Sequence, residues 1–438
     1  MIMQILIFLL QFCGLLVTWY FVTNHNKQDF VFLVLGLILA SQSAVYFGSV
    51  LIVQMRHFFA LMIILSIVFR YKLLRNNLGA MSKIYMLLIL LIFIASAWSQ
   101  YPKDFFILKF HRTIYSVLMI FLAGTFRDES DIRKFLWMLF PNLVLLAVGL
   151  TFGLREFSGG MDRLMINEQN SNGVGAFAAY LVLGSVMILV FLKTNVVVKI
   201  VIGVSALGGI SALLSSGSRT AFASCVGAVL VTSITLMSSK KRFFMSGVPV
   251  LVCIAYGGIR IWSNVSISVT ERLLMIATGG TSGRDIVWEQ GIAYLQQRDL
   301  WQGMGGIVQG FFVQRADLLE GSKVGWGSTL NIYIDAILET GIMGLTLWVL
   351  LLVIFLYRSF RLWRDEKSIY KFAPIAMCLF GLLQGVGESM SMNSEMPIGM
   401  FMLIGIVTLS ARHFQWGERI DGQRFPVRYD IPYGYRVF

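Results

Sequence analysis

Long apolar runs recur from one end of this sequence to the other, and they constrain its fold more than any other feature. Each run holds about 18 to 22 residues, enough to cross a hydrocarbon core of roughly 30 Å as a helix. Hydrophobic residues make up 57% of the chain, charged residues make up 13%, and the mean hydropathy is +0.75. These values are outside the range of ordinary globular chains. The pattern predicts an all-α fold, a polytopic integral membrane helix bundle.

The predicted spans form a single polytopic membrane domain over residues 1–438, with no separate soluble domain. They lie at 2–22, 30–48, 51–70, 83–98, 107–126, 133–153, 174–192, 197–214, 219–237, 243–261, 329–357, 371–388 and 395–411. The second and third spans are separated only by Gly48 and Ser49. We therefore expect about 12 to 13 transmembrane helices. The first span has neither a basic leader nor a small-residue cleavage site, so we expect a retained anchor rather than a signal peptide.

The net charge of +13 comes from short basic clusters between the spans, such as Lys240 to Arg242 and Arg358 to Lys371. Such clusters mark the cytoplasmic side of a membrane protein, so they do not indicate nucleic-acid binding. Alternation then places residues 154–173 and 262–328 outside as a small and a large loop, and the tail 412–438 inside. The four cysteines have no paired spacing and no histidine companions. We therefore expect no disulfide framework, no metal site and no cofactor.

The large outer loop, residues 262–328, is too long to be a simple link. Within it, apolar Ile286, Val287 and Leu295 are mixed with polar Glu289 and Arg298 in an amphipathic helical pattern. We expect this segment to pack over the helix bundle as a lid.

Arg219 stands at the start of an apolar span, directly after "SSGS". Helix N-termini carry partial positive charge and unpaired N–H groups, so an arginine there is unfavourable unless an anion joins it. Ser216 and Ser218 are candidate caps, Gly217 permits a close backbone approach, and the guanidinium supplies two parallel donors. This combination predicts a phosphate or diphosphate site. The alternative is an arginine that only reaches toward the membrane surface.

The same pattern recurs in the large outer loop, where Arg284 follows "TSG" and opens the amphipathic segment. Thr281 or Ser282 is the expected cap, and Gly283 leaves room for a bound group. The alternative is a solvated ion pair between Arg284 and Asp285 or Glu289.

Two further inward-running spans begin with polar side chains on the outer side. The seventh span offers the candidate ligands Arg163, Asn167, Asn170 and Asn172, and the eleventh offers Asn331, Tyr333, Asp335 and Glu339. Asn331, Asp335 and Glu339 are spaced by four, so they share one helix stripe that descends into the membrane. A carboxylate at the depth of Glu339 must face protein or water. The alternatives are a structural hydrogen bond for Glu339 and cap or turn roles for the asparagines.

Trp288 in the large outer loop is a candidate sugar-stacking residue, together with Trp301, Trp326, Phe311 and Phe312. Aromatic residues also serve as anchors at membrane surfaces, which is the alternative for each of them.

Four segments, in order, resemble the bacterial O-antigen polymerase and O-antigen ligase superfamily (Wzy/WaaL). They are "NSNGVGA", "SGSRTA", "GRDIVWEQGIAYLQQRDLWQGMGGIVQGFF" and "LNIYIDAILETGIMGL", and the resemblance covers about residues 167–352. The first 130 residues agree only in hydropathy. The resemblance implies a metal-independent, GT-C-like glycosyltransferase of the bacterial inner membrane, with its active site facing the periplasm. It further implies undecaprenyl-diphosphate-linked oligosaccharide as donor, with Arg219 and Arg284 holding the diphosphate.

One position departs from the pattern of this superfamily. Where its ligases carry a histidine before the asparagine of the eleventh span, this chain has Leu330. The departure argues against a ligase and favours a polymerase. His111, near the outer end of the fifth span, is a possible replacement base, although an interfacial role is the commoner one. Asp335 and Glu339 are the favoured bases, and Glu388 is a further candidate.

A polymerase would transfer a growing glycan from one undecaprenyl diphosphate to the sugar of another lipid-linked repeat unit. Fixed cations would stabilise the departing diphosphate without a metal. Expected partners are the bilayer, a chain-length regulator and a flippase. The alternatives are an O-antigen ligase that uses lipid A-core as acceptor, and a lipid-linked oligosaccharide flippase or transporter. A transporter would spread polar groups along a path through both leaflets, whereas here they gather on one side.

Overall fold

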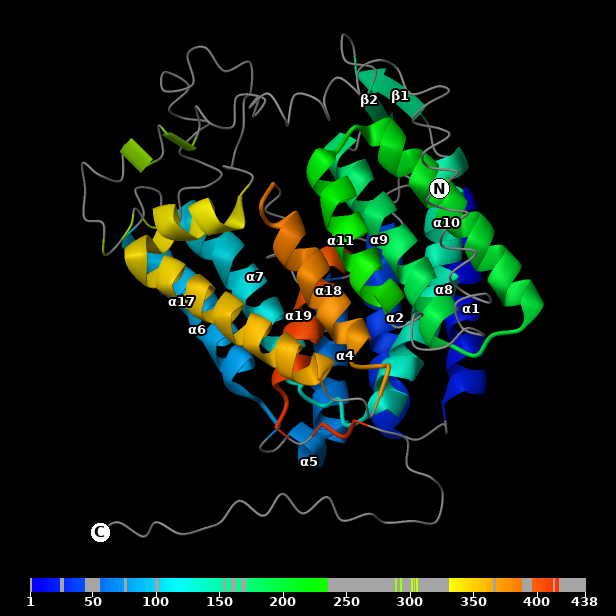
Figure 1. Ribbon diagram of the computed structural model, residues 1–438, viewed down its shortest axis with the longest axis horizontal. Helices are drawn as coiled ribbons and strands as arrows, with labels where there is room; N and C mark the ends of the chain where they lie inside the picture. The colour runs from blue at the N-terminus through cyan, green and yellow to red at the C-terminus, as the bar shows by residue number, and fades with distance from the viewer. Residues whose placement is uncertain are drawn as a thin grey trace.

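The computed structural model describes residues 2–23, 27–43, 56–74, 77–98, 102–152, 155–158, 163–166, 171–234, 331–364, 368–387, 396–412 and 414–416, and a few positions between 288 and 305. The helices in these ranges run up and down beside one another as a bundle (Figure 1). The helical membrane fold predicted from the sequence is confirmed. Every predicted span coincides with a helix except 243–261, which lies outside the described residues.

The first half of the chain contributes the following elements, in order: α1 (Ile2–Val22), η1 (Lys27–Asp29), α2 (Phe30–Ser43), α4 (Arg56–Phe69), α5 (Tyr71–Leu74), α6 (Ala80–Ala95), η3 (Ser96–Trp98), α7 (Pro102–Ala123) and α8 (Glu129–Phe152). The second half contributes β1 (Arg155–Ser158), β2 (Arg163–Ile166), α9 (Ser171–Phe191), α10 (Val196–Ser216), α11 (Arg219–Ile234), α17 (Ile332–Trp363), α18 (Phe372–Gln384) and α19 (Pro397–Ser410). The second and third predicted spans are distinct helices, α2 and α4, which pack together.

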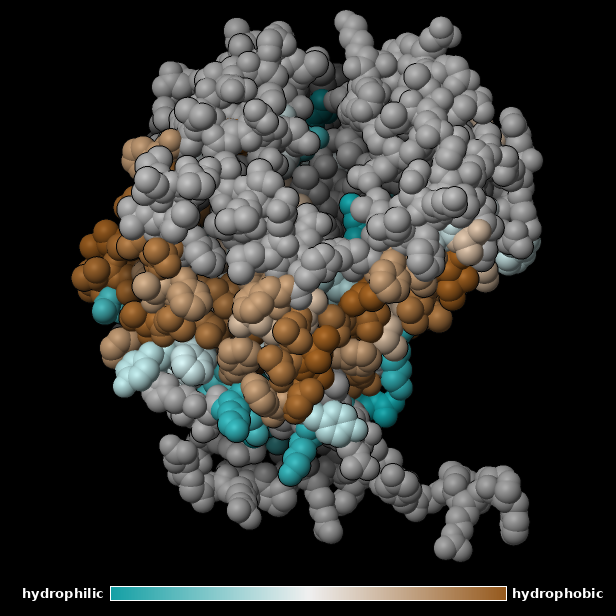
Figure 2. Space-filling view, turned by 180° about the vertical axis from the view of Figure 1, so that it is seen from behind, coloured by the Kyte–Doolittle hydropathy of each residue, from teal (hydrophilic) through white to brown (hydrophobic). Residues whose placement is uncertain are grey.

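Helices α2, α9 and α19 form the centre of the bundle. Nearly every residue of each is buried, which fits sequences that are apolar on all sides. Around them, α1, α10 and α17 expose large apolar side chains such as Phe21, Val197 and Leu356. Figure 2 shows the result as a hydrophobic belt across the molecule. Four of the described helices, α8, α9, α10 and α17, are long and apolar enough to cross a membrane, and shorter apolar helices accompany them.

Small residues permit close helix contacts in this core. A Cβ added to Gly405 of α19 would lie 2.6 Å from the carbonyl oxygen of Pro374 in α18, and one added to Gly381 would lie 2.3 Å from the Cβ of Met402. Such contacts matter in a bilayer, because lipid is as apolar as leucine and packing replaces the hydrophobic effect.

The described outer loop contains a hairpin that the all-α prediction did not include. Residues 155–158 and 163–166 pair as antiparallel strands, with Ser158 opposite Arg163. Gly159 and Gly160 stand between the two strands in the sequence, a composition suited to hairpin turns. Ile166 is fully buried, and β2 packs against α9 and α10. The hairpin therefore belongs to the end of the bundle where α9 begins (Figure 1).

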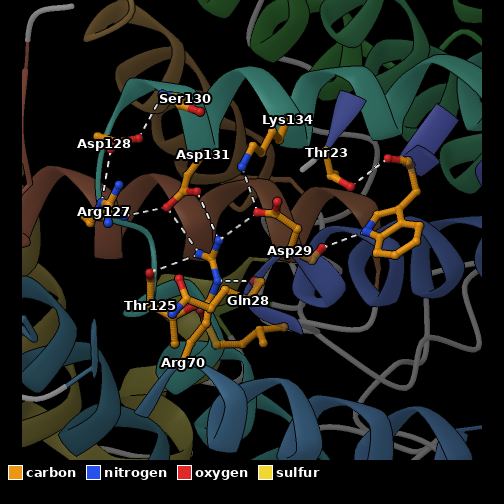
Figure 3. Close-up of polar contacts among 12 residues, drawn as sticks. Thr23, Gln28, Asp29, Arg70, Thr125, Arg127, Asp128, Ser130, Asp131 and Lys134 are labelled. Carbon is orange, nitrogen blue, oxygen red and sulfur yellow. Dashed lines mark hydrogen bonds and ion pairs between the residues drawn. The ribbon is translucent and has the colours of Figure 1, made fainter. Parts of the chain in front are cut away.

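The opposite end of the bundle contains a buried ionic cluster (Figure 3). The guanidinium of Arg70 donates to both carboxylate oxygens of Asp131, at 3.1 and 3.2 Å, and lies 3.5 Å from Asp29. Lys134 donates to Asp29 at 2.7 Å. Arg70 also donates to the carbonyls of Gln28 and Thr125. Two cations and two anions thus compensate one another. In the sequence Arg70 belongs, with Lys72 and Arg75, to one of the short basic clusters that predict the cytoplasmic side. In the structure it is buried and joins the end of α4 to η1 and α8.

A second polar contact joins α1 and α8 inside the bundle. Gln11 donates to the side-chain oxygen of Asn142 at 3.0 Å, and Asn142 donates to the carbonyls of Gly36 and Met138. Asn142 follows Pro141, which has no N–H to contribute to the helix ladder of α8. The amides therefore serve a structural purpose, joining helices around a proline.

Candidate functional site

Arg219 is the first residue of α11, as the sequence predicted, and it follows a tight turn after α10. Gly217 closes α10 in the left-handed conformation, with φ 63°, and the Ser218 carbonyl accepts the first hydrogen bond of α11 from Phe222. Left-handed backbone favours glycine because it has no Cβ. The Ser216 hydroxyl donates to the Leu213 carbonyl and accepts from the Ser218 N–H, so it helps to close the turn.

The turn that carries Arg219 lies directly against the first turns of α9. A Cβ added to Gly175 would lie 2.5 Å from the Cβ of Ser218 and 2.6 Å from the Oγ of Ser216. Asn172 lies in the first turn of α9, so the structure brings this candidate ligand and the Arg219 turn to the same end of two packed helices. In the sequence these two segments, 170–176 and 216–221, are separate motifs.

The eleventh predicted span, α17, begins beside the end of α18. The Ile332 N–H donates to the Gly385 carbonyl at 2.9 Å, and the Tyr333 hydroxyl donates to the Leu382 carbonyl at 2.8 Å. The Asn331 side chain caps α17 by accepting from the N–H groups of Tyr333 and Ile334. Asn331 therefore has the helix-cap role that was the alternative to ligand binding. The Tyr333 hydroxyl also makes a hydrogen bond that joins two helices.

Helix α17 is broken at Gly341, where φ is 66° and ψ is −155°. The segment before the break lies across the end of the bundle, and the long segment after it descends along α6 (Figure 1). The predicted stripe does exist: Asn331, Asp335 and Glu339 are all buried. The break at Gly341 comes after Glu339, so the stripe ends before the long segment of α17 begins. Glu339, Thr340 and Gly341 therefore form a corner between the two segments of α17.

Part of the outer loop rests on this corner. The Gly305 N–H donates to the Glu339 carbonyl at 3.0 Å. Gly303 has φ 65°, and a Cβ added to it would lie 2.4 Å from the Gly341 nitrogen and 2.7 Å from the Thr340 nitrogen. The contact fits the predicted lid over the bundle and attaches the described part of it, which includes Trp301, to the corner of α17.

Replacing Gly303 with Val should detach this part of the loop. Valine at this position must adopt a left-handed backbone conformation, which costs about 1 to 3 kcal/mol. Its Cβ would also collide with the backbone of α17. We expect faster hydrogen exchange at the Gly305 amide and a clear fall in activity. Gly203→Val in α10 is the matched control, since an added Cβ there meets nothing within 4 Å. Exchange as slow as in the wild type would contradict the docking contact.

Helix α18 connects the Arg219 helix to the start of α17. It packs against α11, and the Ser224 hydroxyl lies 2.7 Å from the side-chain oxygen of Gln384. Arg219 stands five residues before Ser224, roughly 7.5 Å farther along the axis. Since α11 and α18 run in opposite directions (Figure 1), Arg219 lies beyond the end of α18, on the side where α17 begins. Arg219 and the buried face of Asn331, Asp335 and Glu339 therefore share one end of the bundle.

The remaining candidates stand as follows. Arg163 lies in β2 opposite Ser158, and Trp288 is part of a helical stretch with Glu289 and is partly buried. Asn167, Asn170, Gly283, Arg284, Leu330 and Glu388 lie outside the described residues, as do Trp326, Phe311 and Phe312. Among the described residues, no group of three or more His, Cys, Asp or Glu side chains is placed to hold a metal ion. The contact between Ser224 and Gln384 was not predicted from the sequence. Its one indication there was a glutamine within an apolar span.

Residues 204–349 match a family model described as O-antigen ligase. The matched range begins within α10 and includes Arg219, the large outer loop and the corner of α17. No curated protein matches the chain.

Proposed function

We propose that this chain is an O-antigen or related polysaccharide polymerase, and the match of residues 204–349 to an O-antigen ligase family model supports a function of this general kind. It transfers a growing glycan from undecaprenyl diphosphate to the sugar of another lipid-linked repeat unit. The reaction takes place at the periplasmic face of the bacterial inner membrane. The observation that carries the proposal is that Arg219 opens α11, and the buried residues Asn331, Asp335 and Glu339 begin α17, at the same end of the bundle (Figure 1).

The orientation of the bundle supports a periplasmic site. The ends of α4 and α17, with Arg70 and the basic residues Arg358, Arg361 and Arg364, lie at the end opposite the hairpin and the Arg219 turn (Figure 1). Basic residues favour the cytoplasmic side. The Arg219 turn, the small loop 154–173 and the large loop 262–328 are therefore proposed to face the periplasm, with the tail 412–438 inside.

The proposed chemistry needs a stabilised leaving group and a proton acceptor. An acceptor hydroxyl forms a bond to the anomeric carbon, while the bond from that carbon to the diphosphate oxygen breaks and its electron pair leaves with the diphosphate. Arg219, with Arg284, stabilises that growing charge without a metal, because fixed donors in a water-poor site need no reorganisation. The hydroxyl proton passes to Asp335 or Glu339. Both carboxylates are buried on the face that begins at Asn331.

The remaining candidate ligands fit around this centre. Ser218, Asn172 and Arg163, with Asn167 and Asn170, would surround the head group from the α9 side, and Gly283, Trp288, Asn331 and Tyr333 from the loop and α17 side. A flippase would deliver the lipid-linked unit, and a chain-length regulator would set the product length. Leu330, in the position of the ligase histidine, supports polymerisation over ligation.

Purified protein in lipid nanodiscs, supplied only with undecaprenyl-diphosphate-linked repeat units, should produce a ladder of longer glycans. Gel electrophoresis of the released glycans measures the result. Product that forms only after lipid A-core is added would identify a ligase. Movement of the units across a liposome bilayer without any new glycosidic bond would identify a transporter. Either outcome would contradict the polymerase.

A further inference from the structure

Gln384 is the last residue of α18 and is fully buried in an otherwise apolar helix. Its side-chain nitrogen has no hydrogen-bond partner among the described residues. Polar side chains within a membrane helix are costly, and they commonly mark a substrate site. At this end of α18, the Leu382 and Gly385 carbonyls accept hydrogen bonds from Tyr333 and Ile332, the first residues of α17. Gln384 therefore lies between α11, which begins with Arg219, and the start of α17, which carries Asn331, Asp335 and Glu339.

The contact with Ser224 does not satisfy the Gln384 amide. The Ser224 hydroxyl lies 3.0 Å from the Ala221 carbonyl and 2.7 Å from the Gln384 oxygen, but it has only one proton to donate. If the amide is turned over, its nitrogen donates to Ser224 and its oxygen loses its partner. In either orientation one polar atom of Gln384 lacks a partner among the residues that the structure describes.

Resting on the polymerase function above, we propose that Gln384 is a further binding residue for the sugar-diphosphate head group of the lipid-linked donor. A diphosphate oxygen accepts from its amide nitrogen. Gln384 stands opposite Ser224, and Arg219 lies five residues toward the outer end of α11, so the two groups are within the reach of one extended head group.

Gln384→Leu should raise the KM for the lipid-linked repeat unit by about 10-fold or more, the usual effect of losing a hydrogen bond to a charged group. Protein abundance and Tm should stay unchanged, because Ser224 keeps Ala221 as its acceptor. Gln384→Met, which is also unbranched, repeats the test if the leucine variant folds poorly. Gln384→Glu should raise the KM further, since a carboxylate repels diphosphate. A KM restored to the wild-type value by Glu would overturn the diphosphate contact and point to a sugar hydroxyl.

Gln11→Leu is the matched control. Gln11 is also a buried glutamine with one amide atom lacking a partner among the described residues, but it lies in α1 beside Asn142. The Gln11→Leu variant should have a lower Tm than the wild type and an unchanged KM for the lipid-linked repeat unit. If Gln384→Leu behaves in the same way, or keeps a wild-type KM, the inference is overturned. If the wild-type protein makes no glycan from lipid-linked units, the polymerase function itself fails, so the two failures can be told apart.

Discussion

Replacing Arg219 with Ala is expected to reduce polysaccharide synthesis by about 100-fold to 1,000-fold, the range seen when a preorganised donor to a developing negative charge is removed. Arg219 opens α11 at the end of the bundle where the Asn331–Glu339 face lies. Its loss leaves the departing diphosphate with less compensating charge. The rate of ladder formation by purified protein at saturating lipid-linked substrate measures the effect.

Arg361→Ala is the matched control for this variant, because Arg361 is an exposed arginine at the opposite end of α17. Arg219→Lys should recover only part of the rate, since lysine retains the charge but not the two parallel donors. Arg284→Ala is expected to act like Arg219→Ala. Normal chain lengths in the Arg219→Ala variant, at normal abundance in the membrane, would refute the proposed role.

Replacing Arg70 with Ala is expected to destabilise the protein by about 3 to 5 kcal/mol, the cost of leaving one member of a buried ion pair without its partner. Asp131 would lose both guanidinium bonds, and Asp29 would lose its ion pair with Arg70 while keeping the one with Lys134. The cluster joins η1, α4 and α8, so the loss should loosen the first third of the bundle (Figure 3). The Tm for thermal unfolding of the protein in detergent measures the effect.

Lys72→Ala provides the comparison, because Lys72 is exposed two residues further along the chain and belongs to the same basic cluster in the sequence. Its effect should remain within about 0.5 kcal/mol. Equal Tm values for the two variants would show that the buried cluster contributes nothing beyond surface charge.

The helices were predictable because the bilayer imposes a strong local rule. The runs that became α9 and α19 are apolar on every side, so both their length and their burial follow from composition. Arg219 was recognised for a similar reason. A cation that opens an apolar helix behind a left-handed glycine conflicts with the local electrostatics, and such conflicts stand out in a single sequence.

The break at Gly341 was not predictable from hydropathy, which runs on through α17 as if it were one span. The glycine permits φ 66°, but the contacts on either side of the break come from distant parts of the chain: Ile332 and Tyr333 bond to the end of α18, and Gly303 lies against Gly341 itself. Asn331 has the cap role that was one of its two predicted alternatives, since its side-chain oxygen accepts from the N–H groups of Tyr333 and Ile334.

The sequence by itself determined the membrane-spanning helices and the arginine that begins α11, because each depends on residues near one another in the chain. Only the tertiary structure decided that Gly175 lies against the Arg219 turn, that Gln384 of α18 faces Ser224, and that Arg70 pairs with Asp29 and Asp131. These contacts join residues from 41 to 160 positions apart. The pairing of such distant groups depends on which helices become neighbours, and no local periodicity encodes that choice.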